Sequence, residues 1–319
     1  MKIVILGAGA LGSLIGAHLA RAGEEVTLIA RGERAKFLRE HGITVTGLAN
    51  FTVPVNIETH PNKVQETDVL LVAVKTYDME EALESVSHLK VGSVLSVQNG
   101  VLKNEQLARY FGWEKTLGAA TMLGGQVMQA GEVRLTFNGV LYLGELPEGT
   151  SERVQALANA LAHAGIQVEF SPQIQTIEWS KYVFFMSLMA PAALTRLETP
   201  KILKDPNLAY LVVMVARETA QLSAKHGIPL VDLGNIRAKT LSSAPIEEAV
   251  AGLRQFGEML EAQGATAIKV STLQDLERGR RIEVEETLGY AVQKGAELDV
   301  RLPTVQTCYR LLTGIDRNL

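Results

Sequence analysis

Three glycines near the N-terminus have the spacing of a dinucleotide-binding loop. The segment 7–12 reads GAGALG, so Gly7, Gly9 and Gly12 form the pattern GxGxxG between an apolar, strand-like run and a helical one. The first glycine permits a tight turn, the second lets the backbone approach a pyrophosphate, and the third allows close packing of helix on strand. The leading N–H groups and the dipole of the helix attract phosphate. We predict that these residues bind a dinucleotide: Gly7, Ala8, Gly9, Ala10, Leu11 and Gly12.

The end of the second apolar run indicates which dinucleotide is bound. NAD sites place Asp or Glu there, about 20 residues past the glycines, to hold the ribose 2′-hydroxyl. Here EVTLIA (25–30) leads into Arg31, with Arg34 close behind. A guanidinium suits a 2′-phosphate and gains little from a neutral ribose. Glu33 argues against this reading, and Arg31 could equally be a solvated charge at a helix start. We predict NADP(H) as the cofactor, with Arg31 at its 2′-phosphate.

Composition excludes several classes of protein. The chain has 319 residues, of which 47% are hydrophobic and 21% charged, and a formal net charge of -4. It is too apolar for disorder, and it is long enough for about two domains of roughly 150 residues. The lone Cys308 and six scattered histidines exclude a disulfide framework and predict no metal site. The acidic balance argues against nucleic acid, and no apolar run reaches the roughly 18 residues of a membrane helix. We expect a cytoplasmic protein.

The first half of the chain has the alternating pattern of an α/β domain. Apolar runs at 2–7, 25–30, 68–75 and 93–100 predict strands of a parallel sheet, separated by helices at 11–22 and 31–42. ITVTG (43–47) and FTVPVNIE (51–58) predict a hairpin-like insertion. GEVRLTFNGVLYLGE (131–145) predicts a second hairpin that turns at Asn138-Gly139. A helix over 152–164 and a strand over 166–170 complete this domain.

The second half is expected to be helical, after a boundary at Ser171-Pro172. Helices are predicted over 174–197, 207–226, 246–263, 275–294 and 305–313. The fold class is therefore α/β: a dinucleotide-binding Rossmann domain over 1–171, followed by an all-α domain over 172–319. The apolar C-terminal helices leave both a monomer and a homodimer open.

In the order and content of its motifs, the chain resembles the ketopantoate reductases (2-dehydropantoate 2-reductases). Six segments match the layout of that family in order, over nearly the whole chain. WxK followed later by LQDxxxGRxxE is more specific to this family than the glycine loop. The matching segments are KIVILGAGALGSLIGAHLARAG (2–23), AVKTYD (73–78), VQNGV (97–101), WSKYVF (179–184), STLQDLERGRRIEVEE (271–286) and LPTVQTCYRLL (302–312).

The resemblance implies a fold, a reaction and a set of site residues. It implies a helical domain like the C-terminal domain of 6-phosphogluconate dehydrogenase, and NADPH-dependent reduction of a 2-oxo acid, ketopantoate to pantoate in the pantothenate pathway. Lys181 would be the general acid, since an ammonium can stabilise and protonate a developing alkoxide. Glu283 would be catalytic and contact both cofactor and substrate, and Ser271 would bind the substrate carboxylate. Asn99 would contact nicotinamide and substrate, and Lys75 the cofactor. From the residues alone, Lys181 could be a snorkelling lysine, Glu283 part of a solvated charge run, and Asn99 part of a turn.

Two positions depart from the family pattern. The family has asparagines four and eight residues after the lysine, where this chain has Phe185 and Met189. Apolar side chains leave a substrate hydroxyl unpaired, at a cost of roughly 1–3 kcal/mol per group. A larger or less hydroxylated 2-oxo acid would suit them better.

Three functions therefore stay open from the sequence. The first is reduction of ketopantoate or of a less polar 2-oxo acid. The second is a neighbouring β-hydroxyacid or opine-type dehydrogenase, although no His–Asp pair stands out in the sequence. The third is a non-catalytic NADP(H)-binding protein on the same fold.

Overall fold

The structure, a computed structural model, describes residues 1–129 and 131–319. Contacts within the chain divide it into two compact units, Met1–Gln175 and Thr176–Leu319, and the division falls in the first turn of one helix, α6 (Ile174–Thr195). A domain boundary at Ser171-Pro172, as expected from the sequence, stays a prediction. Among the described residues, no helix has the length and hydropathy that a membrane span requires.

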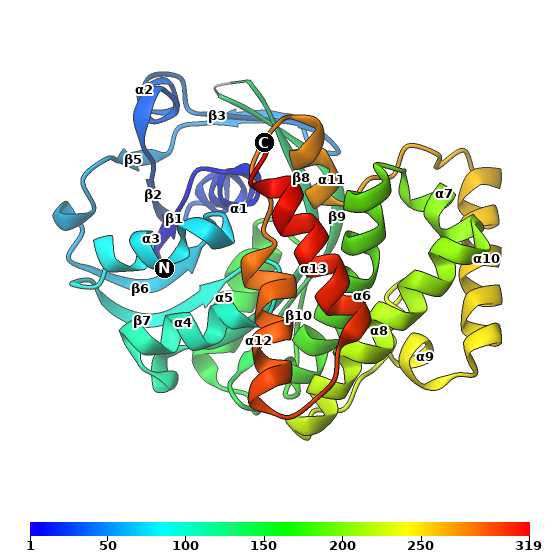
Figure 1. Ribbon diagram of the computed structural model, residues 1–319. Coiled ribbons are helices and arrows are strands. Elements are labelled where there is room, and N and C mark those ends of the chain that lie inside the picture. The colour runs from blue at the N-terminus through cyan, green and yellow to red at the C-terminus, as the bar shows by residue number, and fades with distance from the viewer. Residues whose placement is uncertain (130) are drawn as a thin grey trace. The chain divides into compact units, whose positions relative to one another are not determined.

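A five-stranded parallel sheet forms the centre of the first unit, in the spatial order β5-β2-β1-β6-β7 (Figure 1). Helices lie on its faces, so its central strands are near-continuous apolar runs. This is the predicted Rossmann arrangement. The strands are β1 (Lys2–Leu6), β2 (Glu25–Ile29), β5 (Asn56–Glu58), β6 (Glu66–Val72) and β7 (Lys90–Ser96). The connecting helices are α1 (Ala10–Arg21), α2 (Gly32–His41), η1 (Pro61–Lys63), η2 (Thr76–Asp78), α3 (Met79–Ser85) and α4 (Leu102–Phe111).

A second sheet belongs to the same unit. Its order is β10-β9-β3-β4, with β8 antiparallel to β9. The predicted insertion hairpin is confirmed as the antiparallel pair β3–β4. Its second run, however, divides at Pro54, because proline has no N–H for a ladder, and the remainder becomes β5 of the first sheet. The elements are β3 (Ile43–Gly47), β4 (Phe51–Val53), η3 (Trp113–Lys115), β8 (Leu117–Gln129), β9 (Glu132–Glu145), α5 (Glu152–His163) and β10 (Val168–Phe170).

Helix α1 supplies side chains to the core that joins the two sheets. Leu14 and Leu19 of α1 pack in one buried cluster with Ile5 of the first sheet and Leu141 of the second. The opposite face of the first sheet is covered by α3 and α4 through a separate cluster that includes Val4, Leu70, Met79, Leu83 and Leu107. Close packing on both faces holds the first sheet rigid.

The predicted hairpin turn at Asn138-Gly139 is wrong. Strand β9 runs through both residues without reversing, and Asn138 pairs with Leu123 of β8. The reversal falls between β8 and β9 instead, next to residue 130, which lies outside the described residues. Gly139 is required for a different reason, because a Cβ there would approach the carbonyl oxygen of Met122 to 2.8 Å. The dipeptide thus marks a close strand-to-strand approach with register shifts rather than a turn.

The second unit is helical, as predicted. An isolated two-residue bridge joins Leu233 and Ile236. Two short helices, α7 and α9, have no counterpart in the sequence prediction. After α6 the elements are α7 (Thr199–Lys204), α8 (Pro206–Lys225), α9 (Ala238–Ser243), α10 (Ile246–Ala262), α11 (Ser271–Glu277), the π-helix η4 (Glu285–Gly289), α12 (Tyr290–Glu297) and α13 (Pro303–Asp316).

The single helix predicted over 275–294 is also wrong. It is interrupted after α11, where Gly279 has φ +63°, a left-handed conformation that ends helices. The N–H of Ile282 is then bound by Asp316 Oδ1 at 2.7 Å rather than by the preceding helical turn. The charged segment 278–284 is therefore an irregular connection, and Glu283 lies within it.

A buried carboxylate fixes the last helix of the second unit. Glu218 of α8 is 5% exposed, and its two oxygens accept the N–H groups of Thr304 at 3.0 Å and Val305 at 2.9 Å. These are leading N–H groups of α13, which have no partner within the helix. The negative charge also lies at the positive end of the helix dipole.

Removing that carboxylate should destabilise the protein. We expect Glu218→Ala to lower the free energy of unfolding by about 2–4 kcal/mol, because two buried N–H groups lose a charged acceptor. Glu218→Gln retains one acceptor oxygen and should lie between alanine and wild type. Urea denaturation followed by circular dichroism measures both. The control Glu258→Ala removes an exposed carboxylate of α10 and should change stability by less than about 0.5 kcal/mol. Equal effects of the two alanine variants would contradict the capping role.

Candidate functional site

The predicted cofactor residues of the first unit follow strands that end in register. Leu6 of β1 is paired with Ile29 of β2 on one side and with Val72 of β6 on the other. Val72 is in turn paired with Ser96 of β7. Because parallel strands share one carboxyl edge, the loops that follow this row lie at the same edge of the sheet, where ligands of open α/β sheets bind (Figure 1). The structure thus places the glycine loop, Arg31, Lys75 and Asn99 along one edge.

Two of the three loop glycines are required by the protein itself. Gly7 has φ +112°, and a Cβ there would come within 2.9 Å of the backbone nitrogen of Val74. A Cβ on Gly12 would overlap the carbonyl oxygen of Gly7. Gly9 differs, since a Cβ would meet only the oxygen of Ala73, at an ordinary 3.6 Å. Packing within the chain does not require glycine at position 9, which suits close approach of a ligand to this backbone.

The N-terminus of α1 fits an anionic ligand. Gly9 is the N-cap residue with φ −72°, and the first turn has no acidic side chain. Within the described residues, no side chain caps this helix end. The first intrahelical bond is donated by Ser13 to Gly9, at 3.0 Å, so the N–H groups before it point out of the helix end. A pyrophosphate matches both these donors and the dipole.

Gln98 ties together the loops that carry Lys75 and Asn99. The buried Gln98 side chain donates to the carbonyl of Val74 at 2.9 Å and accepts from the Ser96 hydroxyl at 3.0 Å. It therefore joins the loop after β6 to the loop after β7. Lys75 and Asn99, which are both half-buried, stand next to these anchors. Sequence reasoning missed Gln98, although its place just before Asn99 at a strand end was a usable signal.

Arg31 and Arg34 lie in different environments. Arg31 precedes α2, its side chain is 65% exposed, and its Nη1 donates to Glu81 Oε1 at 2.8 Å. Arg34 is turned inward, where its Nε donates to the carbonyl of Ala8 at 2.7 Å. Burial lowers the pKa of the Arg34 guanidinium, which still remains charged at neutral pH. Arg31 is therefore the guanidinium accessible to a 2′-phosphate, and Arg34 is bound to the glycine loop.

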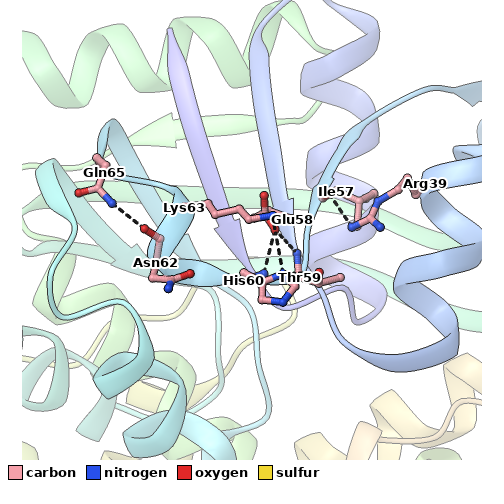
Figure 2. A network of polar contacts seen from close by, with 8 residues as sticks. All are labelled: Arg39, Ile57, Glu58, Thr59, His60, Asn62, Lys63 and Gln65. Carbon is pink, nitrogen blue, oxygen red and sulfur yellow. Dashed lines mark hydrogen bonds and ion pairs between the residues drawn. The ribbon is translucent and has the colours of Figure 1, made fainter.

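At the carboxyl end of β5, the side chain of Glu58 binds the backbone of the residues that follow it (Figure 2). Glu58 Oε1 accepts the N–H groups of Thr59 at 2.8 Å and His60 at 2.9 Å, and Lys63 Nζ lies 4.0 Å away. The bond from the His60 backbone, the larger cause, holds the pKa of the Glu58 carboxyl below its usual range. Arg39 of α2 donates to the carbonyl of Ile57 beside it, at 3.3 Å. The carboxylate of Glu58 thus stabilises the loop after β5.

In the second unit, the predicted acid Lys181 lies on α6, directly after two residues whose side chains contact other parts of the unit. The Trp179 ring lies 5.3 Å from the His226 ring and 5.7 Å from that of Tyr182. The Ser180 hydroxyl accepts from the N–H of Val231 at 2.9 Å. Successive helix residues point about 100° apart, so Lys181 points in a different direction from Trp179 and Ser180. It shares a face of the helix with Phe185, four residues later. Lys181 and Phe185 are both half-buried.

Met189 belongs to the interior of this unit. Its side chain is fully buried, and its sulfur lies 3.6 Å from the Thr287 hydroxyl. Tyr182 lies seven residues earlier, on the same face of α6, and its hydroxyl donates to the carbonyl of Thr287 at 2.8 Å. Met189 thus packs inside this unit and Phe185 is more accessible, and the replacement of substrate-binding amides at these two positions stays a prediction.

The π-helix η4 connects α6 to Glu283. The Thr287 hydroxyl donates to the carbonyl of Glu283, and Gly289 N–H bonds to Val284 five residues back, at 2.9 Å. Single π-turns of this kind frequently occur at functional sites. Burial raises the pKa of the Tyr182 phenol, which stays protonated and able to donate. Tyr182 and Thr287 thus connect the helix of Lys181 to the backbone of Glu283, and sequence reasoning had singled out neither.

Ser271 begins α11, next to the buried Thr272 and one turn before the buried Asp275. The preceding loop is held by Lys269, whose Nζ bonds to Glu277 Oε1 at 2.5 Å. The role of Ser271 at the substrate carboxylate stays a prediction. Within residues 1–129 and 131–319, no three His, Cys, Asp or Glu side chains are grouped as metal ligands.

Comparison with known proteins gives matches over almost the whole length. Residues 3–148 match the family model Ketopantoate reductase PanE/ApbA, and residues 173–316 match the model for its C terminal. The 2-dehydropantoate 2-reductase of Archaeoglobus fulgidus is 31% identical over 318 residues, covering 100% of this chain and 99% of the relative. That of Pyrococcus abyssi is 28% identical, covering 98% and 97%. The crystal structure of a PanE/ApbA family ketopantoate reductase from Ralstonia eutropha JMP134 superposes with a TM-score of 0.84 at 26% identity, covering 100% of this chain and 99% of that one.

The loop geometry makes opposite predictions for two neighbouring glycines. Gly9→Ala should leave the free energy of unfolding within about 1 kcal/mol of wild type, because the methyl has room and only an N-cap preference is lost. It should nevertheless weaken binding of a dinucleotide, measured by fluorescence titration with NADPH. Gly12→Ala should lower stability by about 2 kcal/mol or more, because its Cβ has no space. A Gly9→Ala variant with unchanged NADPH affinity would contradict ligand approach at this backbone.

Proposed function

The chain belongs to the ketopantoate reductase PanE/ApbA family, and we propose that it reduces 2-dehydropantoate to pantoate with NADPH. The observation that carries the proposal is the in-register carboxyl edge of the first unit, which aligns the glycine loop with Arg31, Lys75 and Asn99. The family residues of the second unit, Lys181 and Glu283, support the same reaction. A cytoplasmic location is a further expectation from the sequence, which leaves a homodimer open beside a monomer.

The residues of the first unit suit NADPH. When bound, the nicotinamide supplies a hydride to the carbonyl carbon of the 2-oxo acid. The loop 7–12 would hold the pyrophosphate through backbone N–H groups at the start of α1. Arg31 would bind the 2′-phosphate through its exposed guanidinium, in exchange for its present partner Glu81. Lys75 and Asn99, at the adjacent strand ends, would hold the nicotinamide half.

Lys181 would supply the proton. As the carbonyl oxygen gains negative charge, a nearby ammonium stabilises it and transfers a proton to give the 2-hydroxyl. Lys181 suits this role because the two residues before it, Trp179 and Ser180, hold its helix against the segment 226–231. Glu283 would orient substrate and cofactor, and its backbone is held by Thr287. Ser271 would receive the substrate carboxylate.

Phe185 favours a second candidate, a reductase of a less polar 2-oxo acid. It follows Lys181 by one helical turn, is half-buried, and presents an aromatic ring where the family has an amide. An apolar wall leaves the hydroxyl of 2-dehydropantoate without a partner from this position. Met189 gives this alternative no support, because it packs on Thr287.

Replacing Lys181 tests the proposed chemistry. Lys181→Ala should lower kcat by about 10²–10⁴-fold, because the general acid is lost. The Kd for NADPH should stay near the wild-type value, since Lys181 is not among the residues proposed to bind the cofactor. The control Lys201→Ala removes an exposed, ion-paired lysine of α7 and should be fully active. An active Lys181→Ala enzyme would refute the assignment of the acid.

Replacing Phe185 tests the substrate. Phe185→Asn restores the amide of the family pattern and should raise kcat/KM for 2-dehydropantoate relative to apolar 2-oxo acids by about tenfold, the value of one hydrogen bond of roughly 1–2 kcal/mol. Phe185→Leu, which stays apolar, is the control and should leave the ratio near that of wild type. An unchanged ratio in Phe185→Asn would mean that this side chain does not line the substrate site.

A further inference from the structure

We propose that Arg34 is a positioning residue for the dinucleotide: it fixes the orientation of the Ala8–Gly9 peptide in the glycine loop and does not contact the cofactor itself. Its relevance to the cofactor rests on the dinucleotide binding proposed above. The claim about the loop depends only on contacts within the first unit. Nothing in the GxGxxG pattern requires an arginine at this place.

The guanidinium of Arg34 makes a contact with each of its three nitrogens. Nε donates to the carbonyl of Ala8 at 2.7 Å, Nη2 to the hydroxyl of Ser13 at 3.0 Å, and Nη1 to the carbonyl of Gln129 at 3.2 Å. These partners belong to the glycine loop, to α1 and to the end of β8. A planar guanidinium directs its donors along fixed directions, so three contacts define one position for the group.

Ser13 completes the arrangement around the same carbonyl. Its side chain is fully buried, and its hydroxyl donates to Ala8 O at 3.1 Å while accepting from Arg34. Ala8 O therefore receives two donors, one of them charged. Charge-assisted hydrogen bonds are roughly twice as strong as neutral ones. The carbonyl of Ala8 is thus held toward Arg34 and Ser13.

Fixing this carbonyl also fixes an N–H group. In a planar trans peptide, the C=O of one residue and the N–H of the next point in opposite directions. With Ala8 O held toward Arg34 and Ser13, the N–H of Gly9 points away from them. Gly9 is the residue at which the loop leaves room for a ligand. Arg34 thereby orients a donor for the pyrophosphate before any ligand is bound, and such preorganisation strengthens binding.

The inward position of Arg34 separates its role from that of Arg31. Arg31 is exposed, and its effect should be confined to a cofactor that carries a 2′-phosphate. The pyrophosphate is common to NADPH and NADH, so a loop-positioning residue should affect both alike. The ratio of the NADPH and NADH affinities therefore distinguishes a residue that binds the 2′-phosphate from one that positions the loop.

The test compares dissociation constants for NADPH and NADH in four variants. Arg34→Met and Arg34→Lys should each weaken the binding of both cofactors by a similar factor of about tenfold or more. Neither side chain can donate in the three directions of the guanidinium. Arg31→Ala should weaken NADPH alone. Arg39→Met is the matched control, since Arg39 lies on the same helix and donates to a backbone carbonyl, that of Ile57, outside the loop. It should leave both constants unchanged.

Hydrogen exchange of the unliganded protein tests the loop directly. The N–H of Gly7 bonds to Ile29 O at 3.1 Å and that of Ser13 to Gly9 O at 3.0 Å. Both amides should exchange faster in Arg34→Met than in wild type or Arg39→Met. Unchanged exchange would overturn the proposal, as would an Arg34→Lys variant with wild-type affinity, or a loss confined to NADPH. If the wild-type protein bound no dinucleotide, the proposed function would fail, while the exchange rates would still decide whether Arg34 holds the loop.

Discussion

The register of four parallel strands is the constraint on which the rest of the cofactor half depends. Because β2, β1, β6 and β7 end in one row, short loops suffice to bring their first residues to a common edge. The fit is close: Gly7 must be glycine because the backbone of Ala73 and Val74 stands against it. A shift of one strand by one residue would move its loop along the edge and turn its side chains to the other face.

Side chains outside the glycine pattern hold these loops in place. Gln98 joins the loops after β6 and β7, and Arg34 with Ser13 binds the loop after β1. Each is buried or partly buried, and each acts on a backbone carbonyl rather than on a ligand. The second unit contains contacts of the same kind, since the hydroxyl groups of Tyr182 and Thr287 donate to backbone carbonyls at and near Glu283. Precise placement of reacting groups depends on such supporting contacts.

The sequence predicted the fold well where patterns are local. The parallel sheet, the glycine loop and most helices could be read from apolar periodicity and glycine stops. The turn predicted at Asn138-Gly139 was wrong, because a two-residue turn and a close approach of two strands both favour glycine. The break before Glu283 begins at Gly279, a local signal, but the irregular segment that follows is held by Asp316, far along the chain, which binds the N–H of Ile282. Long-range hydrogen bonds of this kind leave no local pattern.

For the site residues, too, local patterns could be predicted from the sequence and long-range contacts could not. Their positions at strand ends followed from the sequence, but the opposite environments of Arg31 and Arg34, three residues apart, did not. Helix spacing placed Phe185 and Met189 together, whereas the contact with Thr287 assigns Met189 to the core. Spacing gives the face of a helix only approximately, and packing decides which of two neighbouring side chains stays accessible.

The most direct test of the central claim is the rate of NADPH oxidation by the purified wild-type protein, offered 2-dehydropantoate and a series of apolar 2-oxo acids. We predict NADPH-dependent turnover with at least one of these acids, one 2-hydroxy acid formed for each NADPH consumed, and slower turnover with NADH. Binding of NADPH without turnover of any acid in the series would contradict the account and leave a non-catalytic dinucleotide-binding protein.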